Sequence, residues 1–174
     1  MRLTRRSSHV RWPEQVPRPT LAVVLVAGAA PATRGQGLAH GGHALGRVEF
    51  PVTCSAEAQA AFNRAVAILH HMTYPQAREA FQHIAATDPR CAMAHWGIAM
   101  TLFQPLWPTR PGPEALRQGW EAVQKPRALG PATERERLFV AAVEAFFLEP
   151  ASPDYWLRIR RWEEAMQKVH ARFP

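Results

Sequence analysis

The chain contains few cysteines: only Cys54 and Cys91 occur among its 174 residues. They do not form a Cys-x-x-Cys pair, which argues against a thioredoxin-like redox motif. The sequence also lacks G-x-S-x-G, G-x-x-x-x-G-K-[ST] and G-x-G-x-x-G, the motifs of serine hydrolases, P-loops and dinucleotide-binding sites. Carboxylates lie mostly near expected helix starts or beside arginines. We therefore expect no enzymatic activity and no cofactor.

Acidic residues are scarcer than basic ones, and the net charge is +7. Residues 1–32 contain five arginines and one glutamate, whereas the remaining 142 residues carry 16 basic and 13 acidic side chains. In that larger part the two signs are interspersed, as in "TERERLF", which is typical of solvated helix faces. No basic stripe or binding motif is present, so no nucleic-acid partner is predicted.

Long apolar runs are absent too. The most apolar stretch, residues 20–32 ("TLAVVLVAGAAPA"), is shorter than the roughly 20 residues that a membrane helix needs. It follows an arginine-bearing segment and ends in small-x-small, which predicts a signal peptide over residues 1–32. The protein would then be periplasmic or secreted, with no stable membrane span after cleavage. A buried N-terminal helix or an uncleaved anchor is the alternative.

Residues 33–50 are rich in glycine and histidine before they turn apolar, which predicts a flexible linker. His40 and His43 in this segment could bind a metal ion. An incidental histidine-rich linker is the preferred interpretation.

Prolines, by contrast, are abundant, and several recur at a regular spacing. Three segments place a small or bulky residue, an apolar residue four positions later and a proline eight further on: Ala77, Phe81 and Pro89; Gly119, Val123 and Pro131; Trp162, Met166 and Pro174. The prolines are 42 and 43 residues apart. This spacing indicates an internal repeat.

A second helical segment precedes each of these three frames. Apolar residues spaced i, i+3, i+4 and i+7 predict helices over 56–71 and 75–87. The other helices are expected over the ranges 91–103, 113–125, 134–148 and 153–172.

Capping residues support these boundaries. Ser55 is a predicted N-cap, Pro75 suits a first turn, and Thr133 with Glu136 forms a predicted capping box. Ser152 followed by Pro153 is expected to cap the last helix. Pro126 is expected to kink or end the helix in which it falls.

The repeat resembles that of the tetratricopeptide (TPR) family at Ala65, Ala77, Phe81, Pro89 and Ala99. The stretch 50–100 is most similar to bacterial exported TPR-containing proteins of poorly defined function. The resemblance implies an all-α solenoid of about three helical hairpins, or six helices, over residues 51–174, with repeats at about 56–89, 91–131 and 133–174. TPR units have about 34 residues. In repeats 2 and 3 the residues beyond this length lie between the two helices, as in "QPLWPTRPGP".

Cys54 precedes the first helix of repeat 1, and Cys91 follows its second helix. The two ends of an antiparallel hairpin lie side by side, so in an exported protein these cysteines are predicted to form a disulfide. In the chain-entropy model it would contribute about 3–4 kcal/mol. Two buried free thiols are the alternative.

In TPR proteins the inner face of the first helix of each hairpin forms the peptide groove. Carried over by resemblance, this groove comprises Phe62, Val66, Leu69, His70, Met93, Trp96, Met100, Phe103, Leu138 and Ala142. It is apolar and aromatic, and it lacks the lysine, asparagine and arginine set that clamps a peptide carboxylate. The expected partner is therefore a protein or peptide with an apolar segment. Alternatively, the groove is filled by the chain's own residues 48–52 or by further repeats.

The sequence thus predicts an exported scaffold for protein–protein interaction. One alternative is a periplasmic module that binds a small ligand or a metal through His70 and His95 at the repeat interface, although no established metal-ligand spacing is present. Another is a remnant of a longer array. TPR arrays usually end in a solvating helix. None follows the third repeat here, which leaves three alternatives: a truncated array, a partner that covers this end, or self-association through it.

Overall fold

The computed structural model describes residues 45–105 and 109–174, so the predicted signal peptide and most of the predicted linker lie outside the described residues. The described ranges contain six α-helices and no strand: α1 (Ala56–His70), α2 (Tyr74–Thr87), α3 (Ala92–Phe103), α4 (Pro113–Leu129), α5 (Glu134–Phe147) and α6 (Tyr155–Arg172). The predicted all-α fold is confirmed. Within these ranges, none of the helices combines the length and apolarity that crossing a membrane requires.

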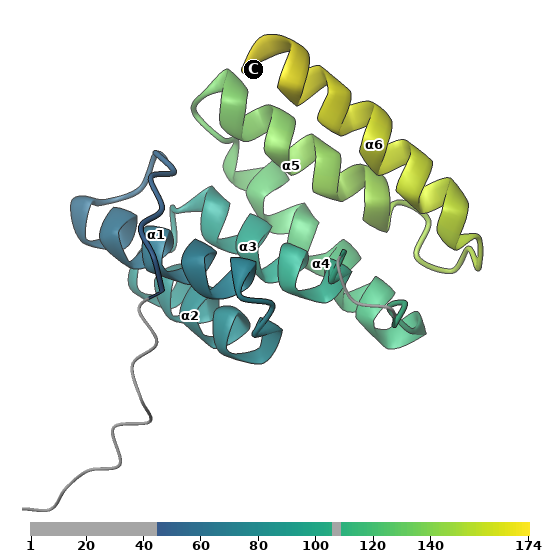
Figure 1. Cartoon of the computed structure of the whole chain (residues 1–174), viewed down its shortest axis with the longest axis horizontal. Helices are drawn as coiled ribbons and strands as arrows, with labels where there is room; N and C mark the ends of the chain where they lie inside the picture. The colour runs from purple at the N-terminus through teal and green to yellow at the C-terminus, as the bar shows by residue number, and fades with distance from the viewer. Residues whose placement is uncertain (1–44, 106–108) are drawn as a thin grey trace, which may run out of the picture. The chain divides into compact units, whose positions relative to one another are not determined.

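The helices pair as three successive hairpins, with α3–α4 between α1–α2 and α5–α6 (Figure 1). Each helix packs against the next one in the chain. In addition, α3 contacts α1 and α5 contacts α3, whereas no Cα atom of α2 lies within 8 Å of one in α4. The first helices of the three hairpins therefore form a row, α1–α3–α5, as the sequence predicted.

Local capping explains where several helices begin. The Ser55 hydroxyl accepts a hydrogen bond from the Ala58 amide at 3.2 Å, and Pro75 lies in the first turn of α2. Thr133 and Glu136 form the reciprocal capping box of α5. These three predictions are confirmed, and each depends on residues within one helical turn.

The helix that contains Pro126 runs further than predicted. The expected range 113–125 stops before the proline, but α4 continues through it to Leu129 and ends at Gly130, whose φ is +68°. Pro126 removes one backbone donor from the last turn, a modest loss near a helix end. Its ring is buried, and the apolar contact offsets that loss.

The start of α6 also differs from the prediction. Asp154, not Ser152, is the N-cap: its carboxylate accepts from the Leu157 amide at 2.9 Å. Ser152 lies one residue before the proline, and its hydroxyl accepts instead from the Asp154 amide at 3.4 Å. The helix therefore begins at Tyr155, two residues later than expected.

The core is centred on α3, which is apolar around most of its circumference. Nine of its twelve residues are buried, because α1, α2, α4 and α5 all pack on it. Two glycines allow close helix contacts. A Cβ atom on Gly97 would overlap the Phe81 ring, and one on Gly119 would overlap the Phe147 ring.

Candidate functional site

A short non-helical segment, residues 48–53, crosses α1 on the side of the α1–α3–α5 row; we call it the strap. The Phe50 amide donates to Asn63 Oδ1 at 3.1 Å, and Gln59 Nε2 donates to the Phe50 carbonyl at 2.9 Å. The Val52 amide donates to Gln59 Oε1 at 2.8 Å. Because Phe50 and Val52 bond on the same side, the strap has the two-residue alternation of an extended chain.

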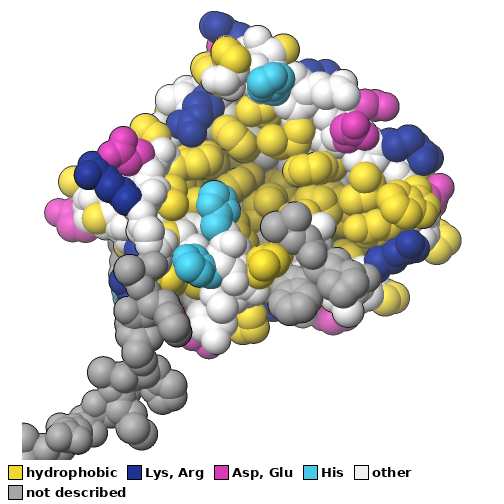
Figure 2. Space-filling view, viewed as in Figure 1, with side chains coloured by type: hydrophobic (Ala, Val, Ile, Leu, Met, Phe, Trp, Pro, Cys, Tyr) yellow, Lys and Arg dark blue, Asp and Glu magenta, His cyan; other side chains and the backbone are white. Residues whose placement is uncertain are grey.

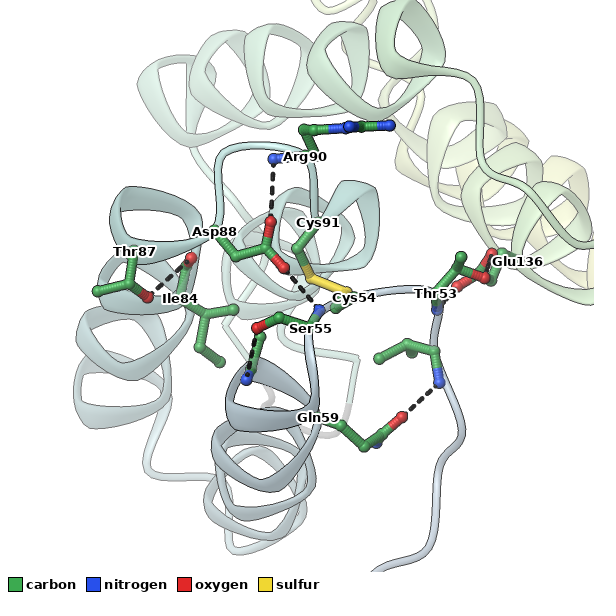
Figure 3. The surroundings of a disulfide bond; sticks show 12 residues. Thr53, Cys54, Ser55, Gln59, Ile84, Thr87, Asp88, Arg90, Cys91 and Glu136 are labelled. Atoms are coloured by element: carbon green, nitrogen blue, oxygen red, sulfur yellow. Dashed lines mark hydrogen bonds between the residues drawn. A yellow bond between two sulfur atoms is a disulfide. The ribbon is translucent and has the colours of Figure 1, made fainter.

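The far end of the strap is bonded to α5. Both the amide and the hydroxyl of Thr53 donate to the Glu136 carboxylate, at 2.5 and 2.9 Å (Figure 3). Arg135 donates to the Pro51 carbonyl at 3.3 Å. Two helices from different hairpins, α1 and α5, thus bind the backbone of one extended segment.

Glu136 is 3% exposed, which by itself would raise its pKa. Hydrogen bonds from Thr53 and Thr133 outweigh this effect and hold the pKa of the carboxyl below its usual value. The ionised form is therefore the one bound by both the strap and the capping box.

The Phe50 side chain is the aromatic anchor of the strap. Its ring lies 5.7 Å from Phe62, 5.6 Å from Trp96 and 5.1 Å from Phe139, measured between centroids. The Arg135 guanidinium stands 4.3 Å from the Phe50 ring centre, within the range of a cation–π contact. The groove is thus occupied here by the chain's own residues 48–52, one of the two alternatives that the sequence left open.

A disulfide fixes the strap at its C-terminal end. Cys54 and Cys91 are bonded, with their Cα atoms 4.8 Å apart, which confirms the predicted pairing (Figure 3). Beside the disulfide, the Ser55 amide donates to Asp88 Oδ2 at 2.8 Å. The Asp88 carboxylate and the two sulfur atoms lie within 4.8 Å of one another. While the sulfurs are bonded to each other, they are not available as thiolate ligands.

Beyond the strap, the same face remains open and apolar. Figure 2 shows a continuous apolar surface across the middle of this face. A hollow of about 60 Å³, which shares Trp96 and Phe139 with the anchor site of Phe50, is lined by Trp96, Met100, Phe139, Ala142, Val143, Trp162 and Met166. We call the strap site and this open surface together the inner groove. The helix at its centre, α3, contains no Asp, Glu, Lys or Arg.

Many of the predicted groove residues are buried. Phe62, Val66, Leu69, Met93, Phe103 and Ala142 are buried, and Trp96 is 6% exposed. Met100 and Leu138 are half-buried, and His70 is exposed. The reason is that α1, α3 and α5 each pack against two or more helices, and that Phe50 of the strap packs on Phe62 and Trp96. Trp96 and Ala142 also line the hollow.

The structure does not bring His70 and His95 together. The disulfide joins the chain just before α1 to the chain just before α3, so the two helices start side by side. His95 lies in the first turn of α3, whereas His70 is the last residue of α1. Burial, and secondarily Lys125, lowers the pKa of His95.

Several groove residues were missed from the sequence. Gln59 and Asn63 bind the strap backbone, while Arg135 and Phe139 cover its aromatic ring. Their spacing is the sequence signal that could have identified them. Gln59 and Asn63 are four residues apart on one helix face, and so are Arg135 and Phe139.

No protein-family model, curated protein or solved structure matches this chain.

Proposed function

We propose that this protein is an exported, tetratricopeptide-like scaffold whose inner groove binds an extended, apolar segment of a partner protein. The observation that carries the proposal is the strap. An extended segment with an aromatic anchor already lies in the groove, and side chains of α1 and α5 bind its backbone. In this proposal the partner segment takes the place of the strap and continues over the open part of the groove.

The strap is suited to exchange because its backbone hydrogen bonds to other described residues all involve side chains. Gln59, Asn63, Arg135 and Glu136 provide them. Its release therefore leaves the backbone hydrogen bonds of the helices intact. A partner segment gains, in addition, the apolar surface around Met100 and Trp162 that the strap does not cover. Apolar burial at about 25 cal/mol per Å² favours this exchange.

The groove chemistry defines the kind of segment that would bind. The anchor position favours an aromatic side chain, because Phe62, Trp96 and Phe139 surround it. The backbone of the segment is bound by the side-chain amides of Gln59 and Asn63 and by the carboxylate of Glu136. Arg135 stacks on the anchor ring. An internal extended segment fits this set better than a free C-terminus, which would need a cluster of cations.

Export is part of the proposal. It is supported by the leader-like sequence of residues 1–32 and by the disulfide between Cys54 and Cys91. Disulfides of this kind persist in oxidising compartments and are rare in the cytosol.

Site-specific photo-crosslinking in the producing cell tests the proposal. A photoreactive benzoyl-phenylalanine at Met100, inside the groove, should give discrete adducts, whereas the same group at the exposed Gln82 of α2 should not. Adding Phe50→Ala should increase the Met100 adducts several-fold, because it removes the anchor that holds the strap. Equal labelling from both positions, or no response to Phe50→Ala, would contradict the proposal.

A further inference from the structure

Two non-helical segments of the described chain meet at one pocket. One is residues 109–112, which precede α4, and the other is residues 148–154, which join α5 to α6. Together they enclose a pocket of about 320 Å³, which lies in the lower size range of small-molecule sites. Its lining is Arg110, Pro111, Pro113 and Leu116 from the first hairpin, with Pro150, Ala151, Ser152, Pro153, Tyr155 and Arg158 from the second. None of these residues belongs to the inner groove.

The wall of the pocket contains a buried cation. Arg158 is 1% exposed, and its two terminal nitrogens donate to four backbone carbonyls, those of Phe146, Leu148, Glu149 and Ser152, at 2.6–3.0 Å. Its Nε is buried without a hydrogen-bond partner. A guanidinium stays protonated in proteins, so a positive charge lies in the pocket wall.

A second cation, Arg110, lies at the pocket and forms no ion pair within the part of the chain that the structure describes. It stacks over Tyr155, with its Cζ 4.6 Å from the ring centre, and over Trp156 at 5.4 Å. Trp156 is 58% exposed. The carboxylate nearest to Arg110 in sequence, Glu114, pairs with Arg117. Glu149 pairs with Arg161 at 3.0 Å and Asp154 caps α6, and both also attract the Arg158 guanidinium.

Two helices begin at the same place. The pocket includes Pro113, the first residue of α4, and Tyr155, the first residue of α6. The partial positive charge of these helix N-termini is offset by Glu114 in the first turn of α4 and by the capping Asp154 of α6. The described lining therefore combines prolines, leucine and tyrosine with two arginines and contains no Asp or Glu.

We propose that this pocket binds a small molecule in which an aromatic or aliphatic body carries one carboxylate. The apolar body would lie against the prolines and the Tyr155 ring, and the carboxylate would bind Arg110, with the buried Arg158 adding to the attraction. A strongly hydrated dianion fits less well, because most of the lining is apolar and cannot replace its water. The site is independent of the inner groove, so either proposal can fail without the other.

Titration calorimetry with 3-phenylpropionate tests this assignment on the full chain. We expect saturable one-to-one binding to the unaltered protein and at least tenfold weaker binding of 3-phenylpropionamide, which has the same shape without the charge. This comparison requires no variant to fold. Equal affinity for acid and amide, or no saturable binding of the acid, would overturn the proposal.

A matched pair of variants locates the site. Arg110→Gln should weaken 3-phenylpropionate binding at least tenfold. Arg127→Gln makes the same charge change near the other end of α4, about 20 Å from Pro113 at 1.5 Å per residue, where Arg127 pairs with Glu144, and it should leave binding unchanged. If the two variants bind equally, the carboxylate is not held at this pocket. Circular dichroism verifies that both variants keep their helices.

Discussion

At the scale of single residues, Glu136 links the strap to the third hairpin. Its carboxylate accepts hydrogen bonds from Thr53 of the strap and from Thr133 of the capping box. The capping box could be predicted, because Thr133 and Glu136 are three residues apart. The hydrogen bond to Thr53 joins residues 83 positions apart in the sequence, and no local sequence pattern predicts it.

Glu136 makes the stability of the protein depend on pH. Burial alone would raise its pKa, but the hydrogen bonds lower it below the ordinary value of 4.5. A carboxyl with a depressed folded-state pKa stabilises the protein above its unfolded-state pKa, and this contribution is lost as the pH falls through the folded-state value. The free energy of unfolding should therefore decrease below about pH 4.5.

Urea unfolding of the native chain and of Glu136→Gln, from pH 7 to pH 3, measures this contribution. The native chain should be the more stable at pH 7, and the difference between the two should shrink below about pH 4.5. Glu163→Gln, an exposed change on α6, serves as the control and should show no comparable effect. A native-minus-variant difference for Glu136→Gln that is constant over the whole range would contradict this role.

Gly119 is the residue that allows α4 to approach α5. Gly119→Ala should destabilise the protein by about 1–2 kcal/mol, because overpacking costs roughly 1–3 kcal/mol and the gain in helix propensity recovers up to about 1 kcal/mol. The new methyl would overlap the ring of Phe147, which is fully buried.

A double-mutant cycle with Phe147→Leu tests this contact by urea unfolding. The smaller side chain should relieve much of the clash, so that Gly119→Ala costs less in the Phe147→Leu background. Additive effects of the two changes would show that the glycine is not required by the Phe147 ring.

At the scale of elements, the six helices could be predicted because their signals are local. Apolar residues three and four apart, caps within one turn and prolines at the boundaries all lie inside each helix. The misplaced end of α4 has the same origin. Pro126 stays helical and is buried, and that burial cannot be read from a single helix.

The disulfide joins the starts of α1 and α3 and thereby the first two hairpins. Replacing both Cys54 and Cys91 by alanine should lower the free energy of unfolding by about 4 kcal/mol, as expected for the 37-residue separation of the two cysteines. Urea unfolding of the double variant, beside the native chain with and without reductant, measures it. A loss below about 1 kcal/mol in both the variant and the reduced native chain would show that the disulfide contributes little.

At the scale of the whole molecule, the packing of the three hairpins creates the inner groove and the pocket, which no single helix contains. The row of α1, α3 and α5 brings Gln59, Asn63 and Arg135 onto one extended segment, and two separate loops meet at the pocket around Arg110 and Arg158. The sequence predicted the row of helices and named residues 48–52 as an occupant of the groove. It could not predict the side chains that hold this occupant, because their partners lie in other hairpins.

Fluorescence anisotropy with a synthetic strap peptide tests most directly whether the inner groove recognises extended segments. The probe is a labelled peptide of residues 46–53, GRVEFPVT, titrated with the chain that lacks residues 1–52 and, for comparison, with the full chain. Circular dichroism establishes that the shortened chain keeps its helices.

The shortened chain should bind the peptide saturably. The full chain should bind it at least tenfold more weakly, because its own strap occupies the groove. Replacing the phenylalanine of the peptide by alanine should weaken binding at least tenfold, since a buried aromatic side chain contributes about 1.5–3 kcal/mol. If the folded, shortened chain fails to bind the peptide, or binds the alanine peptide equally well, the inner groove is not a peptide-binding site.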